Sequence, residues 1–167
     1  INHFKPHSRK ENGSAIIKIH SGPTSCSNYT YSSEREYWRD RGVGFIEIDY
    51  RGSTNYGINY RKTLDGNWGI YDTQDVIDVI NYFIKKKKIK NISFILGSDN
   101  LMQFHKWKSW KKIVKLVKII VFSRKGYDRK GMKSTVVKNF KNRIIFIKNR
   151  PISISSTQLK KTVKLNI

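Results

Sequence analysis

Short apolar runs rich in isoleucine recur along this chain of 167 residues and are the feature that most restricts its fold. Runs of this length, bounded by turn-forming residues, are typical of buried strands. We predict five of them, at residues 15–19, 44–49, 92–96, 119–122 and 144–147. Because helical patterns separate them, the sequence predicts an α/β fold with a mostly parallel sheet and flanking helices.

The predicted helices follow from apolar spacing and capping residues. We expect helices at residues 34–41, from Asp72 or Thr73 onward, at 107–117, and from Ser155 or Ser156 onward. Residues 125–141 are basic and weakly patterned, and the sequence favours a loop or a loose helix there.

The charge of the chain is concentrated in its second part. Residues 1–80 contain ten Lys and Arg against ten Asp and Glu, whereas residues 81–167 contain 24 basic residues and only two acids, Asp99 and Asp128. The second part therefore carries the whole net charge of +22. Such asymmetry indicates that the two parts of the chain differ in origin or in function. We therefore predict two parts that meet near residue 80.

Cysteine content and hydropathy indicate the cellular compartment in which the protein is expected. Cys26 is the only cysteine, so no intramolecular disulfide forms and a reducing compartment is expected. No apolar run approaches the roughly 18 residues that span a bilayer, and the first residues lack a signal-peptide core. We therefore expect a cytoplasmic chain with no membrane partner, and, since it begins at Ile1 rather than Met, a fragment of a longer protein.

Three glycine-containing clusters follow the predicted strands of the first part. They are His20-Ser21-Gly22-Pro23, Asp49-Tyr50-Arg51-Gly52-Ser53 with Tyr56-Gly57, and Gly66-Asn67-Trp68-Gly69. Open α/β sheets place their sites at such carboxyl-terminal turns. In this order, over residues 15–80, the clusters resemble the catalytic domain of the prolyl-oligopeptidase family of serine peptidases, most closely its acylaminoacyl-peptidase-like members. The resemblance implies an α/β-hydrolase fold whose oxyanion turn is His20 to Pro23, with Ser21 in place of a glycine.

The same resemblance places a nucleophile at Ser98, in a Gly-x-Ser-x-Gly turn after the next strand. Ser98 has Leu96 and Asn100 where the two glycines belong. Only one histidine, His105, follows it, and Asp128 is the only acid beyond position 99. We therefore expect no catalytic triad, and ordinary turns of an α/β sheet account for the first part.

The second part contains four ordered motifs. They are Phe-Ile-Leu-Gly-Ser-Asp-Asn-Leu at 94–101, Phe-His-Lys-Trp at 104–107, Ile-Ile-Val-Phe-Ser-Arg-Lys-Gly-Tyr at 119–127 and Ile-Ser-Ser-Thr-Gln-Leu-Lys at 154–160. Over residues 91–163 this series resembles the carboxyl-terminal half of nicotinate-nucleotide adenylyltransferase. The resemblance implies a Rossmann-like sheet, with ATP, Mg²⁺ and nicotinate mononucleotide as reactants and pyrophosphate as a product.

Four residues of these motifs suit nucleotide binding. Gly97 lets the backbone approach a nucleotide, and Asp99 accepts hydrogen bonds from sugar hydroxyls. Trp107 offers a flat face to a pyridine ring, and Arg124 donates two hydrogen bonds to a phosphate. Two of them also have a structural explanation, since Trp107, with Trp110, is typical of a core anchor and Asp99 is typical of a helix cap.

The last motif suits a phosphate site at a helix terminus. Ser155, Ser156 and Thr157 are typical of a helix amino terminus, where free N–H groups and hydroxyls receive phosphate. They equally suit a simple capping cluster. Lys160 stands where the family has Arg, which keeps the charge and loses the two-point hydrogen bond.

One family segment is missing, namely the Gly-Gly-x-Phe-Asp-Pro-x-His-x-Gly-His run that holds the ATP phosphates. Because phosphoryl-type transfer depends on positioning and charge, we expect a truncated, impaired nicotinate-nucleotide adenylyltransferase-like protein that arose by gene fusion or deletion. The alternative is a prolyl-oligopeptidase-family fragment lacking its triad. A second alternative is a basic polyanion-binding protein, because residues 85–88 are all lysine and aromatic residues accompany the charge. A Lys- and Ile-rich composition alone also explains that charge.

Overall fold

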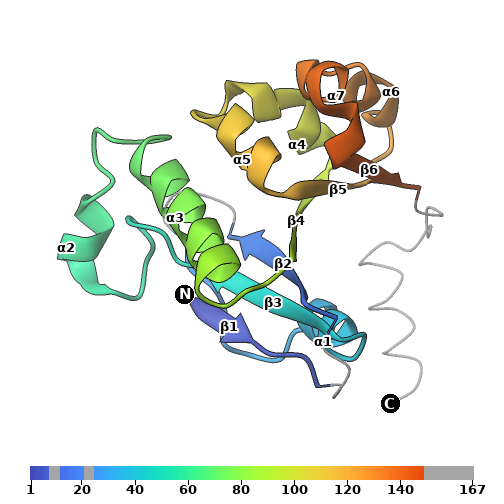
Figure 1. The fold of residues 1–167 in the computed structure, drawn as a ribbon. Helices are drawn as coiled ribbons and strands as arrows, with labels where there is room; N and C mark the ends of the chain where they lie inside the picture. The colour runs from blue at the N-terminus through green and yellow to red at the C-terminus, as the bar shows by residue number, and fades with distance from the viewer. Residues whose placement is uncertain (8–11, 21–24, 149–167) are drawn as a thin grey trace, which may run out of the picture.

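The computed structural model describes residues 1–7, 12–20 and 25–148. One six-stranded sheet runs through them in the order β1-β3-β2-β4-β5-β6 (Figure 1). The strands are β1 (Asn2–Phe4), β2 (Ser14–Ile19), β3 (Val43–Ile48), β4 (Asn91–Gly97), β5 (Lys118–Phe122) and β6 (Ile144–Ile147). Only the β1–β3 pair is antiparallel among the described strands. The α/β class and the mostly parallel sheet are confirmed, and the five predicted strands are all present.

The described helices flank this sheet. They are α1 (Ser33–Arg39), α2 (Gly57–Lys62), α3 (Tyr71–Lys85), α4 (Ser98–Gln103), α5 (Trp110–Leu116), α6 (Asp128–Met132) and α7 (Thr135–Phe140), with short 3₁₀ helices η1 (Phe104–Lys106) and η2 (Lys141–Arg143). None of the helices in the described residues is long and apolar enough to cross a membrane.

One helix prediction needs correction, and the structure decides another, which the sequence leaves open. The helix expected at 107–117 begins only at Trp110, because Ser109 adopts a left-handed backbone with φ of 59° and interrupts the helix before it. Residues 125–141, for which a loop or a loose helix was predicted, contain the two short helices α6 and α7, and Ser134 caps α7 by accepting a hydrogen bond from Val137 N. The helix expected from Ser155 or Ser156 lies outside the described residues.

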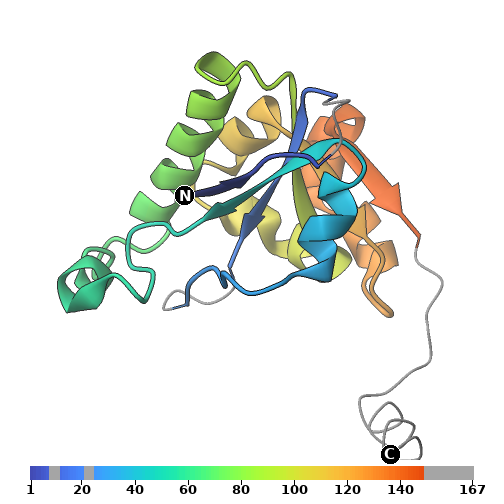
Figure 2. The same ribbon diagram turned by 90° about the horizontal axis from the view of Figure 1, so that it is seen from below.

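The main core lies between the sheet and the helices of one face. Alternate residues of the strands, such as Ile17, Ile46, Phe94 and Ile119, form one buried cluster with side chains of α3, α4, α5 and α7. Helix α1 lies on the opposite face, against β3 (Figure 2). The cluster joins β2 and β3 to β4 and β5, so one core spans the position near residue 80 where the charge changes.

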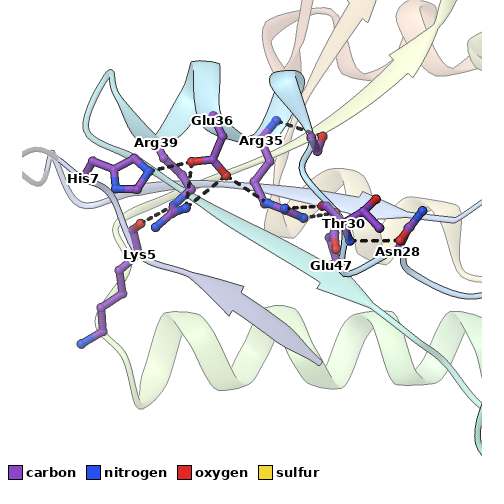
Figure 3. Close-up of polar contacts among 9 residues, drawn as sticks. Lys5, His7, Asn28, Thr30, Arg35, Glu36, Arg39 and Glu47 are labelled. Carbon is purple, nitrogen blue, oxygen red and sulfur yellow. Dashed lines mark hydrogen bonds and ion pairs between the residues drawn. The ribbon is translucent and has the colours of Figure 1, made fainter.

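A polar network fastens α1 to the sheet and to the chain that follows β1 (Figure 3). His7 Nε2 lies 2.6 Å from Glu36 Oε2, and Arg39 donates to both Glu36 oxygens and to the carbonyl of Lys5. Arg35 is buried, pairs with Glu47 of β3 at 3.7 Å, and lies over the Phe4 ring. The hydrogen bond with His7 first, and then those with Arg35 and Arg39, lower the pKa of Glu36 to about 2.

The order in which strands are added to the sheet reverses at β2, and this reversal positions the site. The first crossover places β3 on one side of β2, and the second places β4 on the other side. The β2–β4 pairing runs only from Ser14 and Asn91 to Ile17 and Phe94, so the carboxyl ends of the two strands separate. Ligands of open α/β sheets bind at such a reversal point.

Candidate functional site

A cleft of about 710 Å³ opens where β2 and β4 separate. Its walls come from the carboxyl ends of both strands, from the start of α3 and from the segment around η1. The lining residues are Ile16, Ile17, Lys18, Ile19, His20, Glu34, Tyr50, Trp68, Gly69, Asp72, Thr73, Val76, Phe94, Ile95, Leu96, Asn100, Lys106, Trp107, Lys108 and Ile113. An apolar cavity of this size with a few polar groups is the usual form of a small-molecule site.

Trp107 lies in this cleft and is partly packed and partly exposed. Its ring is 4.9 Å from the Phe104 ring and 6.2 Å from the Phe94 ring, yet 37% of the residue is exposed. Trp110 instead packs edge-on against Phe140, at 5.6 Å. The two tryptophans therefore differ, since Trp110 anchors a helix whereas Trp107 also offers a surface to the cleft.

Gly97, Asp99 and Arg124 lie together where β4 and β5 end. Arg124 Nη1 is 3.4 Å from Asp99 Oδ2, and a Cβ added at Gly97 would collide with Asp99 and lie 2.9 Å from Arg124 Nε. Asp99 Oδ1 is buried and has no hydrogen-bond partner within the part of the chain described. Arg124 has a side chain that is 63% exposed. The group thus combines an unused acceptor with an accessible cation, and it stands beside the cleft rather than in its lining.

Asp128 organises the turn that carries Arg124. Its carboxylate accepts hydrogen bonds from the hydroxyl of Ser123 and from Arg124 N, the latter at 2.9 Å. The bond with Ser123 first, then those with Ser98 and Arg124, lower the pKa of Asp128. The sequence reasoning did not assign Asp128 a role in nucleotide binding, although it is one of only two acids after residue 80.

Ser98 is fully buried at the start of α4, directly after β4. Its hydroxyl accepts a hydrogen bond from Arg124 N at 3.0 Å and also bonds Asp128. These contacts tie α4 to the β5–α6 turn. Ser98 therefore occupies the strand-to-helix position of a hydrolase nucleophile, but its hydroxyl is buried and engaged in holding this turn.

His20 directly follows β2 and lines the cleft. Its Nε2 lies 2.8 Å from Ser53 Oγ, and its ring stacks on Tyr50 with centroids 4.4 Å apart. The rest of the predicted oxyanion turn, Ser21, Gly22 and Pro23, lies outside the described residues. So do Ser155, Ser156, Thr157 and Lys160 of the predicted phosphate site.

The Asp49 to Gly57 segment forms a turn held by carboxylates. Asp75 accepts hydrogen bonds from Arg51 N at 2.8 Å and from the Arg51 guanidinium at 2.7 Å. Asp49 accepts from Ser27 N and Tyr56 Oη, each at 2.6 Å. Burial raises the pKa of Asp49, but these hydrogen bonds outweigh burial and lower it overall. The contacts explain the polar residues of this motif as supports of the turn.

Comparison with known proteins finds two kinds of relative for different parts of the chain. The prolyl oligopeptidase family model matches residues 29–96. A probable nicotinate-nucleotide adenylyltransferase of Pelagibacter ubique is 49% identical over 86 residues, which is 51% of this chain and 47% of that protein. A second, of Clostridium acetobutylicum, is 34% identical over 92 residues, or 53% of this chain and 46% of that protein. Dipeptidyl aminopeptidase BIII of Pseudoxanthomonas mexicana is 25% identical over 71 residues, or 42% of this chain and 10% of that protein.

Solved structures match almost the whole chain, but only in fold. The acylaminoacyl peptidase of Pyrococcus horikoshii has a TM-score of 0.60 at 13% identity, over 90% of this chain and 34% of its own. A puromycin-hydrolyzing peptidase of Mycobacterium tuberculosis has a TM-score of 0.59 at 16% identity, over 98% of this chain and 35% of its own. The sheet is thus similar to that of the peptidases. The chimeric resemblance is confirmed, and the chain spans less than half the length of the adenylyltransferases that it matches.

Proposed function

We propose that this protein binds nicotinate mononucleotide and ATP, the latter with Mg²⁺, at the carboxyl ends of β2, β4 and β5. It acts as a nicotinate-nucleotide adenylyltransferase-like protein with greatly reduced catalysis. The 49% identity to an adenylyltransferase supports the ligand class. We also propose that residues 1–80 and 81–167 derive from different ancestors, and that the protein is cytoplasmic.

The observation that carries this proposal is the grouping of Gly97, Asp99 and Arg124 beside a cleft that contains Trp107. The Asp99 carboxylate accepts a hydrogen bond from a sugar hydroxyl through Oδ2, the oxygen that lies 3.4 Å from Arg124 Nη1. The exposed Arg124 guanidinium binds phosphate through two hydrogen bonds. Trp107 supplies an aromatic face.

Catalysis is slow in this proposal because one wall of the site has a different origin. Strand β2 lies next to β4 and ends at Ile19, and the sequence after it lacks the phosphate-binding segment described above. Positioning and charge stabilisation of the phosphates supply most of the rate in this kind of reaction. Mg²⁺ enters as the counter-ion of ATP and is therefore part of the substrate.

The test is a thermal melt with and without each nucleotide. Ligand at about 100 times its dissociation constant adds about 2.7 kcal/mol to the free energy of unfolding, which raises Tm by about 5–10 °C for a chain of this size. Arg124→Ala should abolish that shift. Arg61→Ala should retain it, because Arg61 is equally basic and exposed but lies on α2, which does not line the cleft. If a nucleotide raises Tm, a pyrophosphate-release assay then measures the remaining turnover. A cooperative melt that neither nucleotide moves would overturn the proposal.

A serine hydrolase is the second candidate, favoured by the family match over residues 29–96 and by the place of Ser98. The burial of the Ser98 hydroxyl opposes it. A fluorophosphonate probe separates the two, since labelling that disappears in Ser98→Ala would establish the hydrolase. A polyanion binder would instead bind nucleic acid with a steep dependence on salt, and nicotinate mononucleotide would not compete.

A further inference from the structure

Two exposed tryptophans line the same cleft and come from the two parts of the chain. Trp68 belongs to the turn between α2 and α3 and is 47% exposed, and Trp107 follows η1 and is 37% exposed. Large exposed apolar side chains that gather at one cavity mark a binding site more strongly than scattered ones. The adenylyltransferase-like motifs include Trp107 alone.

The backbone around Trp68 is fixed although its side chain is open. Asn67 N donates to the Leu64 carbonyl at 2.9 Å, and Ile70 N donates to the Asn67 carbonyl at 3.0 Å. On the carboxyl side, Gly69 N donates to Asp72 Oδ2 at 3.2 Å. The tryptophan is therefore held at the cleft by its turn, and a ligand that contacts it has no loop to order first.

The charge beside Trp107 complements an anion. Lys106 and Lys108 flank Trp107 in sequence, and both line the cleft. Lys18, a third lysine of the lining, already pairs with Glu34 at 2.6 Å. The aromatic ring of Trp107 and the side chains of Lys106 and Lys108 therefore lie on one wall of the cleft. Trp68 adds a second aromatic ring from the first part of the chain.

We propose that the cleft is a composite site that binds a planar heteroaromatic ring joined to a phosphate, with Trp68 and Trp107 contacting the ring and Lys106 and Lys108 the anion. The ligand class rests on the function proposed above. The new element is that the peptidase-like part supplies a ligand contact through Trp68. The site therefore combines residues from the peptidase-like part and the adenylyltransferase-like part. It is not only the remaining half of an adenylyltransferase site.

The test is the affinity of nicotinate mononucleotide in alanine and phenylalanine variants. Loss of an aromatic stacking partner costs about 1–3 kcal/mol, so Trp68→Ala and Trp107→Ala should each weaken binding by about 5-fold to 150-fold. Trp68→Phe, which keeps a ring, should bind within a few-fold of the unchanged protein. Trp38→Ala is the control, because Trp38 lies on α1, on the other face of the sheet. Retained affinity in Trp68→Ala overturns the proposal even when Trp107→Ala is weakened.

A direct readout uses the Trp38→Phe/Trp110→Phe double variant, which keeps only Trp68 and Trp107. Nicotinate mononucleotide should quench its fluorescence, and ribose 5-phosphate, which has no aromatic ring, should not. Removing Trp68 as well should reduce the quenching amplitude. An unchanged amplitude would contradict a contact at Trp68 while leaving the proposed function intact. Absence of any nucleotide binding to the unchanged protein would overturn both.

Discussion

Residues 1–80 and the part of the chain after them use polar side chains in different ways. Among the described residues, six ion pairs lie within residues 1–80, and one, Arg124–Asp99, lies beyond them. The earlier part uses its acids to fasten helices and turns to the sheet. The later part has only Asp99 and Asp128, and both contact Arg124. Acids are therefore structural supports in the first part, whereas in the second they order one turn at the site.

The two parts nevertheless share one apolar core, and its loss should have the largest effect. Ile17 is fully buried on β2 and pairs with Ile46 of β3 and Phe94 of β4. Ile17→Ala should lower the free energy of unfolding by about 2–5 kcal/mol. Denaturant unfolding followed by circular dichroism and by tryptophan fluorescence should give coincident transitions, both moved by the same amount.

The control for this prediction is Ile58→Ala, the same change at a residue of α2 that is 59% exposed. It should alter stability by less than about 0.5 kcal/mol. Two separate transitions, with only one of them moved by Ile17→Ala, would show that the parts fold independently.

Removing a structural acid from the first part should have the next largest effect. Asp75→Ala leaves Arg51 N and its guanidinium without their acceptor. Hydrogen bonds to charged groups contribute about 1.5–3 kcal/mol, so we expect destabilisation of that size. Asp65→Ala, at an exposed position, should cost little. Equal melting temperatures for the two variants would contradict a supporting role for Asp75.

In the second part, Asp128→Ala should affect binding more than stability. Without the carboxylate, the turn that carries Arg124 loses its bonds to Ser123 and Arg124 N. We expect nucleotide affinity to fall about tenfold, which corresponds to about 1.4 kcal/mol, with a small change in Tm. Asp78→Ala, an exposed acid on α3, is the matched control for charge. A large fall in Tm with unchanged affinity would place Asp128 among the structural acids.

The smallest effect concerns pH. Because the pKa of Glu36 is lowered from 4.5 to about 2, chiefly by its hydrogen bond with His7, the folded state gains stability above about pH 4.5. That gain is lost as the pH falls toward 2. Melting temperatures measured between pH 6 and pH 2 should therefore decline less steeply for Glu36→Gln than for the unchanged chain. Parallel curves would show that the network in Figure 3 does not depend on the charge of Glu36.

Local patterns predicted the sheet well because each Ile-rich run carries its own signal. Strand β1 was missed, since it has three residues and forms only by pairing with β3. The start of α5 was predicted too early, because apolar spacing does not reveal the left-handed Ser109.

Local sequence patterns could not predict the cleft, because its position depends on where the β2–β4 pairing stops. Gly97, Asp99 and Arg124 were predicted from ordered motifs, and the structure brings them together. Trp68 was visible in the Asn-Trp-Gly motif, but only the fold places it in the same cleft as Trp107.

Hydrogen exchange in the presence of nicotinate mononucleotide tests the central claim most directly, namely that both parts build one nucleotide cleft. We predict slower exchange in peptides from both walls, around residues 67–73 in the first part and around residues 97–108 in the second. Peptides of α2, which lies outside the cleft lining, should not change. Protection confined to the second wall, or no protection at either wall, would contradict the account.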